Sequence, residues 1–431
     1  MKQPEQNEQE FAFIKEKIKD KPVNKKRLLI RMGYNLLCAV IFGAVACFVF
    51  VVLRPYLEEW FCPPEESTIS IPRDDVPLEE DNTETPEEEE KEPEPEPESQ
   101  TVVVREELEI EDYQALQNKL YAIGKQANKS VVTVTGVTSG MDWFNTPYEN
   151  ENRAAGIIIG NNGQELLILT EKKVIAAAQA ISITFMDDTM VSASLKKYDG
   201  NTGIAVIGVL LTEIPEATME QVMIASLGNS YMIEQGTTVL AIGSPLGANY
   251  SILCGTITSS RNEVSTIDRN YTIFTTDIVG SENGSGVIIN LKGEIVGLVL
   301  QDYSSQSDRN TITALSVSEL KQLIEDLSNN RDIPYVGLRL STVTDDIAEE
   351  YKIPKGVYVK SVVLDSPAMT AGIQEADVIV KINGEDIVNV EQYNQRIYAL
   401  NPEDIITITV KRQSGEEYVD LDCVVTAGIL K

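Results

Sequence analysis

The chain has 431 residues, of which 42% are hydrophobic and 24% charged, so it can build ordinary globular cores in about three domain-sized units. Acidic residues outnumber basic ones by 67 to 36, and the net charge of −31 repels phosphate backbones, so we expect no nucleic-acid partner. The sequence contains no histidine, which excludes a Ser-His-Asp or Cys-His catalytic centre and a histidine-ligated zinc site. The five cysteines show no C-x-x-C spacing and imply neither a metal site nor a disulfide framework, and we expect no cofactor.

An uncharged stretch near the N-terminus predicts a transmembrane helix. Residues 32–53 (MGYNLLCAVIFGAVACFVFVVL) run for about 22 residues without a charge, and a helix of that length measures about 33 Å, enough to cross a hydrocarbon core of roughly 30 Å. A cleavable signal peptide is the main alternative, because Ala44-Val45-Ala46 has a small-x-small pattern, but this triplet lies inside the apolar stretch. Residues 1–31 are rich in Lys and Arg, which predicts a cytoplasmic N-terminus and places the rest of the chain outside.

Residues 54–112 form an acidic segment that is rich in Pro and Glu, including the run EEEEKEPEPEPES. Such a composition cannot bury enough apolar surface to offset chain entropy, and like charges and prolines favour extended conformations. We interpret the segment as a disordered stalk that holds the following domains away from the membrane. An acidic interaction tail is the alternative.

Residues 113–330 show short β-branched runs separated by turn residues such as Asn162-Gly163 and Lys292-Gly293, which predicts a mainly β domain built of hairpins. A helix is predicted over residues 316–327, where Leu320, Leu323, Ile324 and Leu327 share one face. Residues 331–431 mix strands with two predicted helices. These helices are Ala368–Ala371, which follows Ser366-Pro367, and Val390–Ala399.

Five segments of the β domain carry motifs in a fixed order. They are Ala154–Gly160, Ile168–Val174 (ILTEKKV), Asp199–Val206 (DGNTGIAV), Leu240–Gly247 (LAIGSPLG) and Asn290–Gly297 (NLKGEIVG). In this order they resemble the HtrA family of serine proteases, including its I-L-T-N-x-H-V, T-D-L-A-V and A-I-G-N-P-F-G segments. The resemblance covers about three quarters of the chain. It implies a chymotrypsin-like (trypsin-like) double β-barrel at residues 113–330 and an α+β PDZ domain at residues 331–431.

The positions that match the family's catalytic triad differ in this chain. The resemblance places Lys173 at the histidine position and Gly203 at the aspartate position. The nucleophile loop is one residue shorter, so Gly284 or Ser285 takes the serine position, depending on the flank that is aligned. A serine hydroxyl is a weak nucleophile without a base, and losing the aspartate alone costs about 10⁴ in rate. We therefore expect no intact catalytic residue and a catalytically inactive homologue, a pseudoprotease.

One alternative is that the chain is an active enzyme. Lys173, as a neutral amine, would activate Ser285 in the manner of Ser-Lys hydrolases, which makes the chain an active serine endopeptidase with a non-histidine base. This requires burial to lower the lysine pKa from about 10.4 towards about 7–8.

The C-terminal domain keeps the family's peptide-binding residues. The segment Tyr335-Val336-Gly337-Leu338 resembles the PDZ carboxylate-binding loop, in which successive backbone N–H groups hold the C-terminus of a peptide that adds as a strand. A helix carrying Tyr393 and Ile397 is expected to form the other wall of the groove.

The hypothesis that follows is a membrane-anchored, inactive HtrA-like protein that binds peptides or unfolded-protein C-termini through its PDZ domain in envelope protein quality control. The resemblance adds homo- or hetero-trimers with HtrA-like proteins as partners, and a bacterial plasma membrane as the location, with the C-terminal domains outside. An envelope-stress sensor that reports PDZ occupancy to the cytoplasmic tail is a further alternative.

Overall fold

The structure of this protein is a computed structural model that describes residues 34, 36, 40–45, 49, 67–75, 109–141, 147–304, 309–415 and 417–430. The chain divides into two units, Met1–Glu65 and Glu66–Lys431. The predicted cytoplasmic segment, 1–31, lies outside the described residues, as does most of the predicted span at 32–53. Among the residues that are described, no helix combines the length and the apolar composition needed to cross a membrane.

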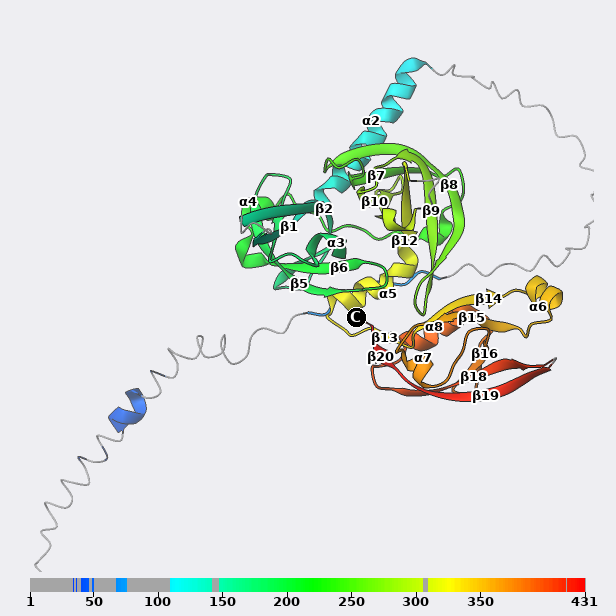
Figure 1. Ribbon diagram of the computed structural model, residues 1–431. Coiled ribbons are helices and arrows are strands. Elements are labelled where there is room, and N and C mark those ends of the chain that lie inside the picture. Colours follow the sequence, from blue (N-terminus) through cyan, green and yellow to red (C-terminus); the bar gives the residue numbers. More distant parts are fainter. Residues whose placement is uncertain are drawn as a thin grey trace, which may run out of the picture. The chain divides into compact units, whose positions relative to one another are not determined.

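Residues 131–316 fold into two closed six-stranded antiparallel barrels (Figure 1). The first barrel has the strand order β1-β2-β3-β6-β5-β4 and the second β10-β11-β12-β9-β8-β7. The first barrel consists of β1 (Val131–Met141), β2 (Pro147–Asn161), β3 (Glu165–Glu171), β4 (Ala180–Thr184), β5 (Met190–Tyr198) and β6 (Ile204–Leu210). The second consists of β7 (Thr238–Ser244), β8 (Ser251–Ser265), β9 (Asn270–Val279), β10 (Ser285–Ile289), β11 (Ile295–Leu300) and β12 (Thr311–Ser316). The predicted double β-barrel is confirmed.

Each barrel buries its own apolar interior, and a third cluster joins the two barrels. Val132, Ile158 and Ile207 lie in the core of the first barrel, and Val239 and Phe274 in that of the second. The joining cluster also includes the apolar face of the helix that follows β12. Because strands alternate their side chains between two faces, strands such as β2 and β7 fill a barrel with one face and supply the joining cluster with the other.

Helices cover the barrels at their edges (Figure 1). They are α2 (Ile110–Ala127), α3 (Lys172–Ile175), α4 (Glu216–Met219) and α5 (Val317–Ser328), with 3₁₀ turns at Asn128–Ser130, Leu211–Glu213, Ser230–Met232 and Gln301–Tyr303. The prediction of a helix over 316–327 is confirmed by α5, whose apolar face is fully buried. Helix α2 was not predicted, and its first residues extend into the predicted stalk.

The predicted stalk, 54–112, is therefore not uniformly disordered. Residues 67–75 lie along α5, where the backbone N–H groups of Ile69 and Ile71 donate to the side chains of Asn329 and Glu325, both at 2.9 Å. Ile69 and Ile71 also pack on the joining cluster. Two isoleucines in alternation supply apolar surface that holds this short stretch.

The C-terminal domain is a sheet of order β14-β15-β16-β18-β19 with helices against it. Its strands are β13 (Pro334–Tyr335), β14 (Leu338–Val343), β15 (Gly356–Val362), β16 (Val378–Ile382), β17 (Glu385–Asp386), β18 (Ile405–Ser414), β19 (Glu417–Thr426) and β20 (Gly428–Ile429). Its helices are α6 (Asp345–Tyr351), α7 (Pro367–Thr370) and α8 (Val390–Tyr398). The two predicted helices correspond to α7 and α8 within one residue at each end. The Ser366 hydroxyl accepts a hydrogen bond from Met369 N–H, which is the expected N-cap of α7.

Candidate functional site

Lys173, which the resemblance predicts at the family's histidine position, lies in α3 directly after β3 and forms an ion pair. Its Nζ lies 2.6 Å from a carboxylate oxygen of Glu171 and 3.8 Å from one of Asp302. The Glu171 side chain is only 6% exposed, and burial raises its pKa although Lys173 opposes the shift. Burial alone would lower the pKa of Lys173, but the two carboxylates outweigh it, so the pKa lies above its ordinary value. The Ser-Lys alternative needs the opposite shift.

Ser285 is the first residue of β10 and is buried. Its hydroxyl oxygen accepts a hydrogen bond from the backbone N–H of Ala155, at 2.9 Å, across the contact between the two barrels. Among the described residues no hydrogen bond joins Ser285 to Lys173, so the structure gives each member of the alternative dyad a different partner. Gly284 lies in the turn before β10, where a Cβ would meet the carbonyl oxygen of Pro245 at 2.6 Å.

Gly203, at the aspartate position, has a φ of +77° and belongs to a turn organised by Asp199. The buried carboxylate of Asp199 accepts hydrogen bonds from Asn201 N–H, at 3.1 Å, and from the N–H and hydroxyl of Thr202, at 2.9 and 2.6 Å. Gly203 carries no side chain and a Cβ there would meet open space. The three positions that resemble the triad thus hold an ammonium in an ion pair, a bare turn glycine, and either a crowded glycine or a buried serine.

The loop Tyr335–Leu338 of the PDZ domain is built to hold a carboxylate. The backbone N–H groups of Val336, Gly337 and Leu338 donate to a single carboxylate at 2.7, 2.8 and 2.9 Å. Gly337 has a φ of +97°, and a Cβ there would lie 2.3 Å from the Cβ of Ser366, so only glycine lets the loop close on an anion. Successive N–H groups aimed at one point form an anion-binding nest.

The carboxylate in this loop belongs to Asp268, at the tip of the hairpin between β8 and β9. Its second oxygen also accepts a hydrogen bond from the Tyr393 hydroxyl of α8, at 2.9 Å. Asp268 is buried, which raises its pKa, and the N–H donors of the loop and the Tyr393 hydroxyl act against that shift. Asp268 was missed by sequence reasoning, because a Thr-Ile-Asp-Arg turn signals only a hairpin.

The predicted groove residues Tyr393 and Ile397 both belong to the hydrophobic core of the PDZ domain and are 0% and 1% exposed. The Tyr393 hydroxyl also donates a hydrogen bond to the bound carboxylate. Tyr335 is half-buried, and Val336 and Leu338 direct their side chains into the core while their N–H groups face Asp268.

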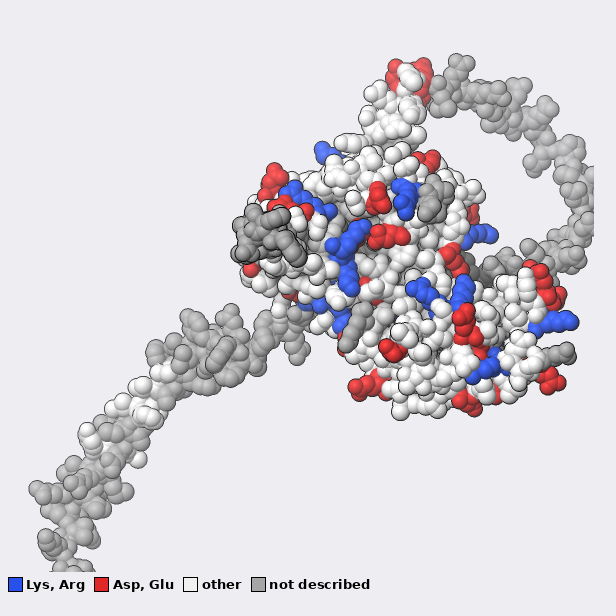
Figure 2. All heavy atoms as spheres, in the orientation of Figure 1, with Lys and Arg blue, Asp and Glu red and all other residues white. Residues whose placement is uncertain are grey.

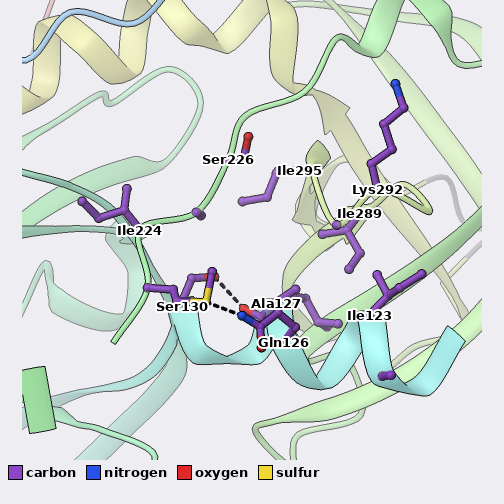
Figure 3. Close-up of a pocket in the computed structure, with 14 residues that line it drawn as sticks. Ile123, Gln126, Ala127, Ser130, Ile224, Ser226, Ile289, Lys292 and Ile295 are labelled. Carbon is purple, nitrogen blue, oxygen red and sulfur yellow. Dashed lines mark hydrogen bonds between the residues drawn. The ribbon is translucent and has the colours of Figure 1, made fainter. Parts of the chain in front are cut away.

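A separate apolar pocket of about 440 Å³ lies between α2 and the second barrel. Figure 3 shows Ile123 and Ala127 of α2 beside it, with Ile289 and Ile295 on the other side. None of the predicted site residues lines it. The described residues contain no group of three or more acidic or cysteine side chains arranged for a metal, and Cys254 and Cys423 are free thiols. Acidic and basic side chains are interspersed over the face shown in Figure 2.

Comparison with family models gives two matches. Residues 154–298 match the trypsin-like peptidase domain and residues 334–423 match the PDZ domain. Curated relatives include a probable periplasmic serine endoprotease DegP-like of Hahella chejuensis, 29% identical over 56% of this chain and 50% of its own length. The serine protease Do-like HtrB of Bacillus subtilis is 28% identical over 60% of this chain and 59% of its own length. The chain thus spans only about half to three fifths of these relatives.

Solved structures share the fold. The HtrA-type protease AlgW with a decapeptide matches with a TM-score of 0.54 and 19% identity, over 72% of this chain and 98% of that one. The same protease with a tripeptide matches with a TM-score of 0.53 and 21% identity, over 72% of this chain and 97% of that one. Together these comparisons show that the chain has a trypsin-like peptidase domain followed by a PDZ domain and is similar in sequence to HtrA-type serine proteases.

Proposed function

We propose that this chain is a catalytically inactive HtrA-like protein that binds peptides or unfolded-protein C-termini through its PDZ domain. The observation that supports catalytic inactivity is the ion pair of Lys173 with Glu171, at the position that the resemblance assigns to the family's histidine. An ammonium held by a carboxylate has no lone pair with which to accept a proton from a hydroxyl. Its raised pKa keeps it protonated at neutral pH.

The buried serine supports the same conclusion. A nucleophile has to approach the substrate carbonyl and to be within reach of a base. Ser285 is 2% exposed, and its oxygen already accepts a hydrogen bond from Ala155 N–H. No imidazole is available as the base, because the sequence contains no histidine, and Gly203 has no side chain to orient one.

The second half of the proposal rests on the carboxylate-binding loop. Three convergent N–H groups, with Gly337 in the left-handed region, form a site suited to the terminal carboxylate of a peptide. The relatives named above include periplasmic serine endoproteases, and two of the similar structures contain a bound peptide. We extend this to peptide binding in protein quality control at the cell envelope for the present chain.

We further propose that residues 32–53 anchor the chain in a bacterial plasma membrane with the C-terminal domains outside. The uncharged sequence and its basic flank support this proposal. We also propose that the chain associates with HtrA-like subunits as homo- or hetero-trimers, and this part of the proposal rests on the family resemblance alone.

The test uses the full chain purified in detergent. It is exposed to a fluorophosphonate probe and to casein, beside a Ser285→Ala variant. We expect neither labelling nor cleavage in either protein. Labelling of the parent chain that is lost in Ser285→Ala would establish a serine endopeptidase instead. Binding is measured separately with a library of peptides that have free C-termini, in which we expect enrichment of apolar terminal residues.

A further inference from the structure

The carboxylate site of the PDZ domain is already filled by the protein's own chain. We infer that Asp268 is an internal ligand of this site, so that an external peptide binds only after the hairpin tip leaves. The inference rests on the proposed function, because it takes the loop Tyr335–Leu338 to be the peptide-binding site. It assigns a role to a residue that belongs to the barrel domain and has no part in the triad.

The hairpin tip also contacts β14, through one hydrogen bond between main chains and two that use side chains. The N–H of Asp268 donates to the carbonyl of Leu338 at 2.6 Å. Three residues earlier, the Ser265 hydroxyl donates to the carbonyl of Leu340 at 3.0 Å, and the Arg339 guanidinium donates to the carbonyl of Ser265 at 2.8 Å. The tip thus lies along the exposed edge of β14, where strand addition would place an external peptide.

The next residue in the tip contacts the opposite wall of the groove. The Arg269 guanidinium lies 3.2 Å from the ring centroid of Tyr398, on α8, and the Arg269 side chain is almost completely buried. Tyr393, five residues earlier on α8, donates to Asp268. The tip therefore contacts both β14 and α8, which are the two walls expected of a PDZ groove.

Contacts within the barrel domain also hold the tip in this shape. Asn201, in the turn that carries Gly203, donates to the Thr266 hydroxyl and to the Ile267 carbonyl at 3.0 and 2.9 Å, and accepts from Ile267 N–H at 3.0 Å. Asp268 itself has a φ of +57°, a conformation that Asp tolerates better than most residues. A ligand that is ordered in advance loses little conformational entropy on binding.

A tethered ligand competes strongly with free ones. Because the hairpin is part of the same chain, its effective concentration at the groove is of the order of millimolar. The apparent dissociation constant of an external peptide equals its intrinsic value divided by the fraction of molecules whose groove is free of the hairpin tip. The inference therefore predicts that the parent chain binds C-terminal peptides weakly and that removing the Asp268 carboxylate strengthens binding.

Two measurements on the full chain test this inference. The first is hydrogen exchange of the amides of Val336–Leu338, which Asp268 holds. We expect them to be protected in the parent chain and to exchange about tenfold or more faster in Asp268→Ala, because the N–H groups lose their acceptor. The second is fluorescence anisotropy with a labelled peptide that ends in Val with a free carboxylate. We expect Asp268→Ala to bind it about tenfold or more tightly than the parent.

Glu263→Gln is the matched control, because Glu263 lies on the same hairpin, is exposed and forms no hydrogen bond or ion pair with the described residues of the PDZ domain. It should change neither measurement. Arg269→Met is a second variant that loosens docking without altering the carboxylate loop, and it should shift both readouts in the direction of Asp268→Ala. Circular dichroism reports whether each variant folds.

The outcomes separate the two proposals. If the loop amides are equally protected in the parent and in folded Asp268→Ala and Arg269→Met, or if the parent already binds the peptide as tightly as these variants, the internal-ligand inference is overturned. If the amides are released in the variants but no peptide binds to any protein, docking of Asp268 stands and the proposed peptide-binding function fails.

Discussion

Glu171 and Lys173 form an ion pair in which the carboxylate is nearly buried and the ammonium is partly exposed. The side chains are 6% and 39% exposed, and Oε1 of Glu171 has no hydrogen-bond partner in the described structure. Lys173 is thus the cation that compensates the charge of the buried Glu171 carboxylate. The ammonium of Lys173 offsets part of the cost of burying the Glu171 carboxylate.

Removing the ammonium should therefore cost stability. We expect Lys173→Met to lower the free energy of unfolding by about 1–2 kcal/mol, a range kept small because water reaches the lysine. The measurement is urea unfolding of the full chain. Lys172→Met is the control, because Lys172 stacks over the Tyr198 ring at 3.8 Å and should cost about 0.5 kcal/mol. Equal losses for the two variants would show that Glu171 does not depend on Lys173.

A second prediction concerns pH and the buried carboxylate of Glu319 on α5. Burial raises the pKa of Glu319 above its ordinary value of 4.5, although the N–H and hydroxyl of Thr272 donate to it at 2.6 and 2.7 Å. In the window between 4.5 and the raised pKa, the folded state binds more protons than the unfolded state. The contribution of Glu319 to stability is therefore largest below this window and is lost as the pH rises through it.

We test this with Glu319→Gln, which cannot titrate. The free energy of unfolding of the parent minus that of the variant should decrease as the pH rises from about 4 to 7.5, because only the parent pays to ionise a buried group. Denaturant unfolding at several pH values gives this difference. Glu213→Gln, at an exposed position, serves as the control. A difference that increases with pH would contradict the assignment.

A third prediction separates backbone strain from crowding in the carboxylate loop. Gly337 and Gly372 both have positive φ, at +97° and +84°, but a Cβ at Gly337 would lie 2.3 Å from the Cβ of Ser366 whereas one at Gly372 meets open space. We expect Gly372→Ala to cost about 1 kcal/mol and Gly337→Ala about 3 kcal/mol. Thermal unfolding of the full chain compares them. Similar costs would mean that Ser366 moves aside freely.

Much of this architecture could be predicted from the sequence. The short β-branched runs predicted a mainly β domain, the resemblance to the HtrA family implied the two barrels, and Ser366-Pro367 predicted the start of α7. Helix α2 was missed because it buries only Leu120 and Gly124, so its sequence carries little amphipathic signal. The stretch 67–75 was missed because its two isoleucines are isolated in a charged segment.

The candidate site could be predicted only in part, for a physical reason. Motif spacing located Lys173 and the loop around Gly337, but it could not identify their partners. The bonds from Asp268 to the PDZ loop join residues 68 to 70 positions apart, and they depend on how a hairpin of one domain meets another. A carboxylate in a hairpin turn is normally expected on the surface, and the groups that hold Asp268 lie far from it in sequence, so its burial has no local signature.

The final prediction tests whether residues 67–75 hold α5 through a buried ion pair. Lys321 is only 5% exposed, and its Nζ lies 2.7 Å from the carboxylate of Asp74, which also accepts a hydrogen bond from the Ser318 hydroxyl. Asp74→Ala leaves the ammonium buried without a counterion, so we expect a loss of about 3 kcal/mol in urea unfolding. Asp75→Ala, at the exposed neighbouring position, should change stability by no more than about 0.5 kcal/mol.

A double-mutant cycle distinguishes the pair from a general effect of the segment. If the cost of Asp74→Ala comes from the unpaired ammonium, then adding Lys321→Met should recover most of the loss, because a methionine tolerates burial. Additive losses in the double variant would show that Asp74 acts through Ser318 or through the backbone of the segment. They would also show that the ion pair does not hold residues 67–75 against α5.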